Sequence, residues 1–272
     1  MNAPDTDHAF AGSIPKLFET LLVPLIFEPY ADDLAARVAT RAPRRVLEIA
    51  AGTGVVTRHM ALLLPEGTSI VATDLNQAML DQAAAVGTAR PVQRRQADAM
   101  QLPFADESFD AVVCQFGVMF FPDKAKAFAE ARRVLAPGGI FLFNAWDRIA
   151  ENEFADTVTI ALQSIFPDDL PRFMARVPHG YHDLAAIAED LKRGGFDAAP
   201  EMVTVSARSR AASARGPAMD FCLGTPLRNE IEARDKTKFE AATDVAERAL
   251  AVRFGHGPVD GKIRAHVVVV RK

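Results

Sequence analysis

The chain has few of the residues that build metal sites and disulfides. It contains two cysteines in 272 residues, Cys114 and Cys222, and neither has a C-x-x-C or histidine partner at metal-ligand spacing. Disulfide frameworks and zinc sites need such closely spaced ligands. We therefore expect no metal site and a location in the reducing cytoplasm.

Long apolar runs and an excess of basic residues are also missing. No apolar run approaches the roughly 20 residues that a bilayer span requires, and no basic segment followed by an apolar stretch opens the chain. We therefore expect a cytoplasmic protein with no stable membrane insertion. The net charge of −4 provides no basic field for phosphate backbones, which disfavours nucleic acid as a partner.

The chain does have a short apolar run that leads into a glycine turn, Val46–Gly54 (VLEIAAGTG). This pattern predicts a buried parallel strand whose following turn passes close beneath a ligand, since Gly52 and Gly54 carry no Cβ. A second apolar run, residues 69–73, ends at Asp74, where a carboxylate is placed to bind a pair of ribose hydroxyls. Together the two segments predict a nucleoside site.

The third glycine of a dinucleotide site is absent, because Thr57 stands where G-x-G-x-x-G has its last glycine. The pattern thus favours a ligand without phosphates. Glu48, inside the first strand, is badly placed for a diphosphate. It suits a cationic ammonium or sulfonium group, with water between them if needed.

Four stretches in order carry a resemblance to a known family. They are Glu48–Gly54, Ala72–Leu80, Gln96–Phe104, and Ser108–Cys114 followed by Arg133–Gly139. Over residues 44–147 the chain resembles the class I S-adenosylmethionine-dependent methyltransferases, and within them the quinone C-methyltransferases of ubiquinone and menaquinone biosynthesis. Ala50 departs from the family, which usually has glycine there. We expect this alanine to tighten the loop over the methionine moiety without preventing binding.

The alternation of apolar strands and helices predicts an α/β fold, a doubly wound Rossmann-like sheet of seven mainly parallel strands with an antiparallel edge strand and a helical lid. Strands are expected near 45–50, 69–74, 91–96, 109–114 and 138–146, with residues 201–207 and 262–271 forming an antiparallel edge hairpin. Three segments are expected: an N-terminal helical lid (1–43), a cofactor-binding core (44–147), and a helical substrate lid with the C-terminal strands (148–272).

An apolar stripe at helical spacing lies within residues 14–26. We interpret it as a helix that covers the mouth of the sheet and closes over the cofactor. The alternative is a helix for a membrane surface or a lipid substrate. Pro24 and the lack of a Lys/Arg cluster count against that alternative.

The resemblance implies a set of cofactor residues. The methionine end would be surrounded by Glu48, Ala50, Gly52 and the rest of the turn, Thr53 and Gly54; the ribose would bind Asp74; the adenine would contact Leu75, Met79, Asp98 and the amide of Ala99; and Gln115 and Phe116 would touch cofactor and substrate. Three of these residues have plainer interpretations. Asp74 also suits a helix cap, Asp98 an exposed turn, and Phe116 core packing.

Methyl transfer from a sulfonium mainly requires alignment of nucleophile, methyl carbon and sulfur, so catalytic residues leave a weak pattern. We identify no general base; the weak candidates are His179, Tyr181 and Tyr30. The first two also fit a loop and a helix start, and Tyr30 also fits core packing. Asn144 and Trp146 end the fifth strand and are candidates for the substrate pocket.

We therefore expect an S-adenosylmethionine-dependent methyltransferase that acts on a small hydrophobic or aromatic acceptor at carbon or oxygen and releases S-adenosylhomocysteine. One alternative is a non-enzymatic S-adenosylmethionine-binding partner or regulator. A nicotinamide-dependent oxidoreductase fits less well, since that class would have a third glycine in the turn, which this chain lacks. The sequence carries no signal for the oligomeric state.

Overall fold

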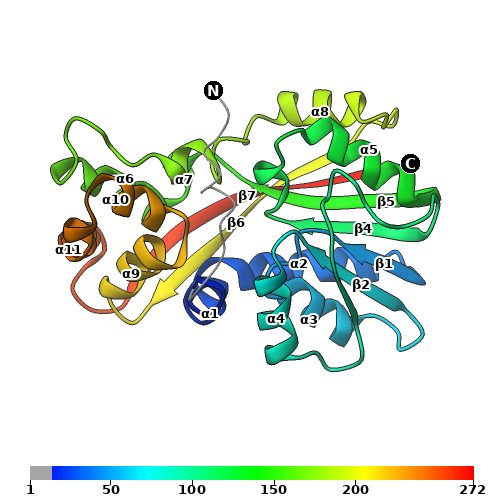
Figure 1. The fold of residues 1–272 in the computed structure, drawn as a ribbon, viewed down its shortest axis with the longest axis horizontal. Helices are drawn as coiled ribbons and strands as arrows, with labels where there is room; N and C mark the ends of the chain where they lie inside the picture. The colour runs from blue at the N-terminus through cyan, green and yellow to red at the C-terminus, as the bar shows by residue number, and fades with distance from the viewer. Residues whose placement is uncertain (1–13) are drawn as a thin grey trace.

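A seven-stranded sheet forms the framework of the computed structural model, which describes residues 14–272 (Figure 1). The strands are β1 (Arg45–Glu48), β2 (Ser69–Asp74), β3 (Gln93–Gln96), β4 (Phe109–Gln115), β5 (Leu135–Trp146), β6 (Glu201–Ala211) and β7 (Val259–Arg271). Their order is β3-β2-β1-β4-β5-β7-β6, and the pairings are parallel except that β7 runs antiparallel to both β5 and β6. The predicted fold class is confirmed. The two last strands pair directly, but residues 212–258 separate them, so they are not a tight hairpin.

Helices cover both faces of the sheet. On one face lie α2 (Glu28–Ala39), α3 (Val55–Leu63) and α4 (Gln77–Val86); on the other lie α5 (Lys124–Val134) and α8 (Leu184–Arg193) (Figure 1). Successive strand residues point to opposite faces. Accordingly, Ala111 and Val113 of β4 join the core under α2 and α3, whereas Val112 and Cys114 join the core under α5. Burial on both faces explains why the central strands β1, β2, β4 and β5 contain apolar runs rather than an alternation.

At one edge of the sheet, β7 and β6 extend beyond the other strands, and a second group of helices lies around this extension. Trp146, the last residue of β5, pairs with Ala265 of β7, so residues 259–264 of β7 and their partners in β6 extend past the end of β5. Around this extension in Figure 1 are α6 (Glu153–Ala161), α7 (Phe173–Arg176), α9 (Arg215–Gly224), α10 (Leu227–Asp235) and α11 (Phe239–Phe254). These helices therefore face the carboxyl ends of the parallel strands.

The apolar stripe predicted near the N-terminus is helical. It consists of α1 (Ile14–Leu17) and the π-helix η2 (Phe18–Phe27), which runs into α2. Pro24 lies inside η2, and a proline disfavours a regular α-helix because it lacks the N–H donor and collides with the preceding turn. Residues 1–13 of the expected N-terminal lid lie outside the described residues. The division into three segments stays a prediction.

Short 3₁₀ turns complete the chain: η3 (Val118–Phe120), η4 (Ile149–Glu151), η5 (Leu162–Ser164) and η6 (Lys236–Lys238). Between residues 14 and 272, no helix has the length and apolar character needed to cross a membrane.

Candidate active site

A cavity of about 220 Å³ opens at the carboxyl ends of the parallel strands, the usual place for a ligand in an open α/β sheet. Most of the predicted cofactor residues meet there: Ala50, Gly52, Asp74, Leu75, Met79, Asp98, Ala99, Gln115 and Phe116. The opposite wall comes from η2, α7 and α9. It is apolar and includes Leu22, Ile26, Phe173, Met174 and Phe221.

The glycine turn after β1 folds through the left-handed region. Gly52 has φ +57° and Gly54 has φ +84°, angles that favour glycine. A Cβ on Gly54 would also lie 3.3 Å from the Cβ of Ala83 in α4. The backbone N–H of Gly52 donates to Asp74 Oδ2 at 2.8 Å, which ties the turn to the end of β2.

Ala50, which departs from the family pattern, also has a left-handed backbone, with φ +52°. Its methyl group faces Gly117, where an added Cβ would lie only 2.5 Å from the Ala50 Cβ. The missing side chain at Gly117 therefore makes the space for Ala50. Gly117 was not singled out in the sequence, although it follows Gln115 and Phe116 directly.

Asp74 is 7% exposed and holds two backbone groups, since Oδ2 accepts from Gly52 and Oδ1 accepts from Asn76 N at 2.8 Å. Burial raises the pKa of this carboxyl, and the backbone hydrogen bonds oppose that rise. The N-cap residue of α4 is Asn76 rather than Asp74. Each carboxylate oxygen has a second lone pair, so Asp74 retains the capacity to accept from two hydroxyls.

Glu48, Thr53 and Gly54 do not line the cavity. Glu48 is 1% exposed and accepts a short hydrogen bond from the Thr57 hydroxyl. Burial raises the pKa of Glu48 to about 8, with the Thr57 hydrogen bond acting in the opposite direction. Thr57 stands at the position of the missing third glycine. Thr53 and Gly54 belong to the turn itself, whereas Glu48 precedes it and Thr57 follows it, both buried.

Asp98 lies in a turn that follows β3. Its Oδ1 accepts a hydrogen bond from Met100 N at 2.8 Å. It is half-buried and lines the cavity, as does the buried Ala99. Asp98 is thus a turn residue, as its plainer interpretation has it, but it is not an exposed one. Leu75, 51% exposed, lies at the rim, whereas Met79 is buried.

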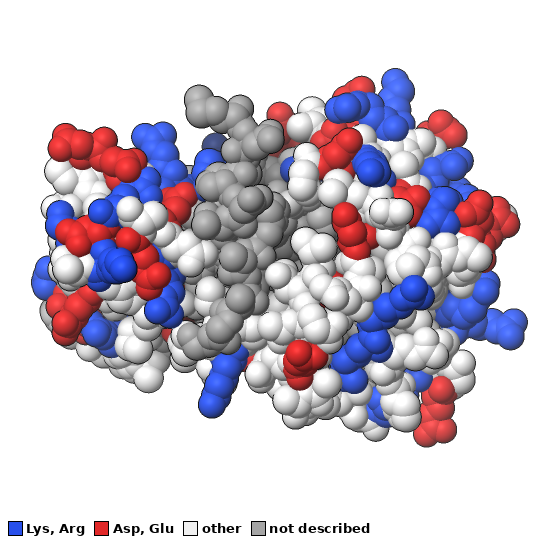
Figure 2. All heavy atoms as spheres, viewed as in Figure 1, with Lys and Arg blue, Asp and Glu red and all other residues white. Residues whose placement is uncertain are grey.

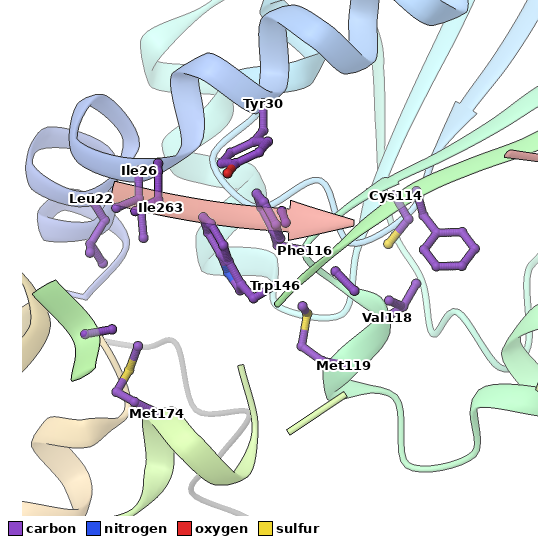
Figure 3. Close-up of a cluster of buried hydrophobic side chains, with 14 of the residues drawn as sticks. Leu22, Ile26, Tyr30, Cys114, Phe116, Val118, Met119, Trp146, Met174 and Ile263 are labelled. Carbon is purple, nitrogen blue, oxygen red and sulfur yellow. The ribbon is translucent and has the colours of Figure 1, made fainter. Parts of the chain in front are cut away.

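An aromatic group forms the wall near the ends of β4 and β5 (Figure 3). The rings of Phe116 and Trp146 are stacked, with centroids 3.7 Å apart and an interplanar angle of 3°. The Tyr30 ring contacts both edge-on, at 5.3 Å and 5.4 Å. Phe116 has φ +50°, and its N–H donates to Asn144 Oδ1 at 2.9 Å. A strained residue held by a buried amide is typical of functional sites. Asn144 itself lies behind the wall, fully buried.

None of the three candidate bases lines the cavity. The Tyr30 hydroxyl donates to Val205 O at 3.2 Å, and the Tyr181 hydroxyl donates to Asp190 Oδ2 at 2.9 Å. His179 Nδ1 donates to Asp147 O at 2.8 Å, and burial lowers the pKa of His179 to about 4. Tyr30 therefore packs in the core, and His179 is a buried neutral histidine.

The apolar side chains on the wall opposite the glycine turn were missed in the sequence. Phe173, Met174 and Phe221 belong to short helices of the C-terminal half. Their only signal was apolar character, which core residues share. Close packing explains the glycine at position 224, since an added Cβ there would lie 3.0 Å from the Leu22 side chain of η2.

Comparisons with known proteins agree with this geometry. A family model described as a methyltransferase domain matches residues 47–143. The demethylmenaquinone methyltransferase of Deinococcus radiodurans is 36% identical over 135 residues, which cover 49% of this chain and 56% of that protein. That of Mycobacterium marinum is 34% identical over 171 residues, which cover 57% of this chain and 68% of that protein.

The YcgJ protein from Bacillus subtilis has the same fold, with a TM-score of 0.57 at 20% identity, over 90% of this chain and 98% of that one. The chain belongs to the class I S-adenosylmethionine-dependent methyltransferases, and S-adenosylmethionine is the cofactor of that family. The predicted family is confirmed, and the nicotinamide-dependent alternative is wrong. The match spans little more than half of the Deinococcus protein.

Proposed function

We propose that the protein transfers the methyl group of S-adenosylmethionine to a small hydrophobic or aromatic acceptor, at carbon or oxygen. One observation carries the proposal. A single cavity has the glycine turn and Asp74 on one side and an apolar, largely aromatic wall on the other. A nucleoside on the first side would present its methyl group to an apolar molecule on the second.

The cofactor would be held by groups already in place. Asp74 would accept from the ribose hydroxyls, Asp98 from the adenine amino group, and Leu75 and Met79 would contact the adenine ring. Glu48 lies next to the turn, and its buried carboxyl is neutral below about pH 8, where its pKa lies. A cationic methionine end would favour the ionised carboxylate, which would then act on it through its charge or through water. The turn itself, Ala50 to Gly54, would lie against the methionine moiety.

In the transfer step, an electron pair of the acceptor forms the bond to the methyl carbon while the pair of the C–S bond stays on sulfur, giving S-adenosylhomocysteine. The acceptor loses one proton. Among the described residues that line the cavity, the ionisable side chains are Asp74 and Asp98, both assigned to the cofactor. We therefore expect an acceptor acidic enough to lose its proton to water. The chain contributes alignment and exclusion of solvent.

The N-terminal helices and the segment after residue 147 would form the acceptor side, with residues 44–147 as the cofactor-binding core. We propose a cytoplasmic location, which the two free, buried cysteines suit. Figure 2 shows Lys and Arg interspersed with Asp and Glu over the face in view, a distribution that favours a small molecule over nucleic acid.

The test is methyl transfer from labelled S-adenosylmethionine to a panel of phenols, hydroquinones, amines and polar acids. We expect product from the phenols or hydroquinones. Product only from amines or polar acids would overturn the proposed acceptor class. Cofactor binding with no product from any acceptor would favour the non-enzymatic binding protein.

A further inference from the structure

An arginine outside the cavity joins the glycine turn to the helix η2 of the opposite wall. Arg58 lies in α3, and its Nη1 donates to the carbonyl oxygen of Thr53 at 2.8 Å. Its Nη2 donates to Glu19 Oε1 of η2 at 2.7 Å. The two charged side chains are largely buried, with 20% of Arg58 and 13% of Glu19 exposed. A planar guanidinium holds two acceptors in a fixed geometry, so the positions of Thr53 and Glu19 are linked.

The glycine turn is held from two sides. On the side of β2, Asp74 accepts from the backbone N–H of Gly52. On the side of η2, Arg58 donates to Thr53, which lies between two glycines with left-handed φ angles. Glycine adopts many backbone conformations, so a turn of this composition needs outside contacts to keep one shape.

The position of Arg58 depends on Glu19. Thr53 directly precedes Gly54, the N-cap residue of α3, so the guanidinium lies beside the helix end that carries a positive partial charge. A cation is unfavourable there unless an anion accompanies it. Among residues 14–272, Arg58 is the one ion-pair partner of Glu19, and Glu19 Oε2 is buried without a hydrogen bond. Removing either side chain therefore leaves the other charge without its partner.

The same helix also forms part of the cavity wall. Leu22, Ile26 and Phe27 of η2 line the cavity, and the Phe27 ring lies 6.0 Å from the Trp146 ring, between centroids. Glu19, in contrast, does not line the cavity. Helix η2 thus contributes apolar side chains to the cavity and, through Glu19, a carboxylate to Arg58.

We propose that Arg58 is a positioning residue for S-adenosylmethionine. It holds the glycine turn in its binding shape, and Glu19 holds Arg58, so the affinity for the cofactor depends on the position of η2. Arg58 does not line the cavity and therefore acts through Thr53. The inference rests on the placement of the cofactor against the turn in the proposed function.

The first experiment measures the affinity for S-adenosylhomocysteine by calorimetry in Arg58→Met, Glu19→Met and the double variant. We expect each single variant to bind about 5- to 30-fold more weakly, the range of one charge-assisted hydrogen bond that is partly exposed. The double variant should match Arg58→Met within about 2-fold, because Glu19 acts through Arg58.

Asp32→Asn is the matched control. It removes an ion pair between Asp32 Oδ1 and His59 Nδ1, 2.8 Å apart, which joins α2 to the same helix α3. This pair contacts neither the turn nor the cavity. The control should therefore bind S-adenosylhomocysteine within about 2-fold of wild-type protein.

A second measurement needs no ligand. Amide hydrogen exchange over residues 52–57 should be faster in Glu19→Met than in wild-type protein, while β4 exchanges at the wild-type rate. A general loss of stability would speed exchange in both segments. Glu19→Gln keeps the shape of the side chain and removes only its charge, so it should give a smaller increase of the same kind and replaces Glu19→Met if that variant does not fold.

Several results would overturn the inference. They are wild-type affinity in both single variants, single losses that multiply in the double variant, an equal loss in Asp32→Asn, or unchanged exchange over residues 52–57. Failure of wild-type protein to bind S-adenosylhomocysteine, or full affinity in Asp74→Ala, would instead refute the proposed function or its cofactor placement. The exchange measurement would still test the link between η2 and the turn.

Discussion

Replacing Gly117 with alanine tests the contact that lets a non-glycine residue occupy the cofactor turn. The added Cβ would lie 2.5 Å from the Ala50 Cβ and 2.7 Å from Cys114 Sγ. Both neighbours are short, and Cys114 is fully buried, so neither can move aside cheaply. Overpacking of this kind costs about 1–3 kcal/mol. At about 2–4 °C per kcal/mol, the melting temperature should fall visibly.

A second change separates this contact from a general loss of stability. Ala50→Gly removes one of the two colliding groups and relieves a left-handed alanine, worth about 1–2 kcal/mol before the entropic cost of glycine, about 0.5–1 kcal/mol. It should therefore be neutral or slightly stabilising alone. In the double variant it should recover part of the Gly117→Ala loss, with a coupling of about 1 kcal/mol or more. The contact with Cys114 keeps the recovery incomplete.

The assay is urea unfolding of wild-type protein, both single variants and the double variant. Gly67→Ala is the matched control, because nothing lies within 4 Å of its added Cβ. Two results would refute the reasoning: a Gly117→Ala variant as stable as Gly67→Ala, or single effects that add to within about 0.5 kcal/mol.

Further predictions concern buried titratable groups and the single tryptophan. Burial raises the pKa of Glu48 from 4.5 to about 8, so its contribution to stability is complete below about pH 4.5 and is lost as the pH rises through 8. Between pH 5 and 8.5, the unfolding free energy of wild-type protein should fall by at least about 1 kcal/mol more than that of Glu48→Gln. Urea unfolding that shows the same pH dependence for both proteins would argue against a buried neutral carboxyl. His179 has its pKa lowered from 6.5 to about 4, so wild-type protein should lose stability as the pH falls through that window, and His179→Asn should remove the loss. The same variant should retain methyl transfer within about 10-fold, since a general base is worth about 100-fold or more; a larger loss would restore His179 as the base. Trp146, the only tryptophan, lines the cavity, so ligand binding should change the intrinsic fluorescence, and an unchanged spectrum at saturating S-adenosylhomocysteine and acceptor would place the ligands elsewhere.

The parts of the fold that were predictable carry their signal locally. Strands buried on both faces produce apolar runs, and Gly52 and Gly54 mark a turn whose φ angles only glycine adopts easily. The strand β6 was expected to end at residue 207 but continues to Ala211, because pairing with β7 extends it through residues of low apolar content. Pairing of that kind is set by the neighbouring strand.

The site was harder to predict wherever it depends on the direction in which a side chain points. Tyr30, Tyr181 and His179 have the right chemistry in the sequence, but their polar atoms turn to partners outside the cavity. Conversely, Gly117 lies against Ala50, which is 67 positions earlier in the chain, and no local sequence pattern marks this contact. Phe173 and Phe221 line the cavity from α7 and α9, helices that lie around the part of β6 and β7 beyond the end of β5 (Figure 1).

The most direct test of the central claim is calorimetric titration with S-adenosylmethionine and S-adenosylhomocysteine, with NADH as a negative ligand. We predict micromolar binding of both sulfur nucleosides and none of NADH. Asp74→Ala removes the carboxylate that holds Gly52 and Asn76 and should weaken binding about 100-fold or more, whereas Asp81→Ala, at an exposed position of α4, should not. Absence of binding, binding of NADH alone, or equal affinities in the two variants would contradict the account.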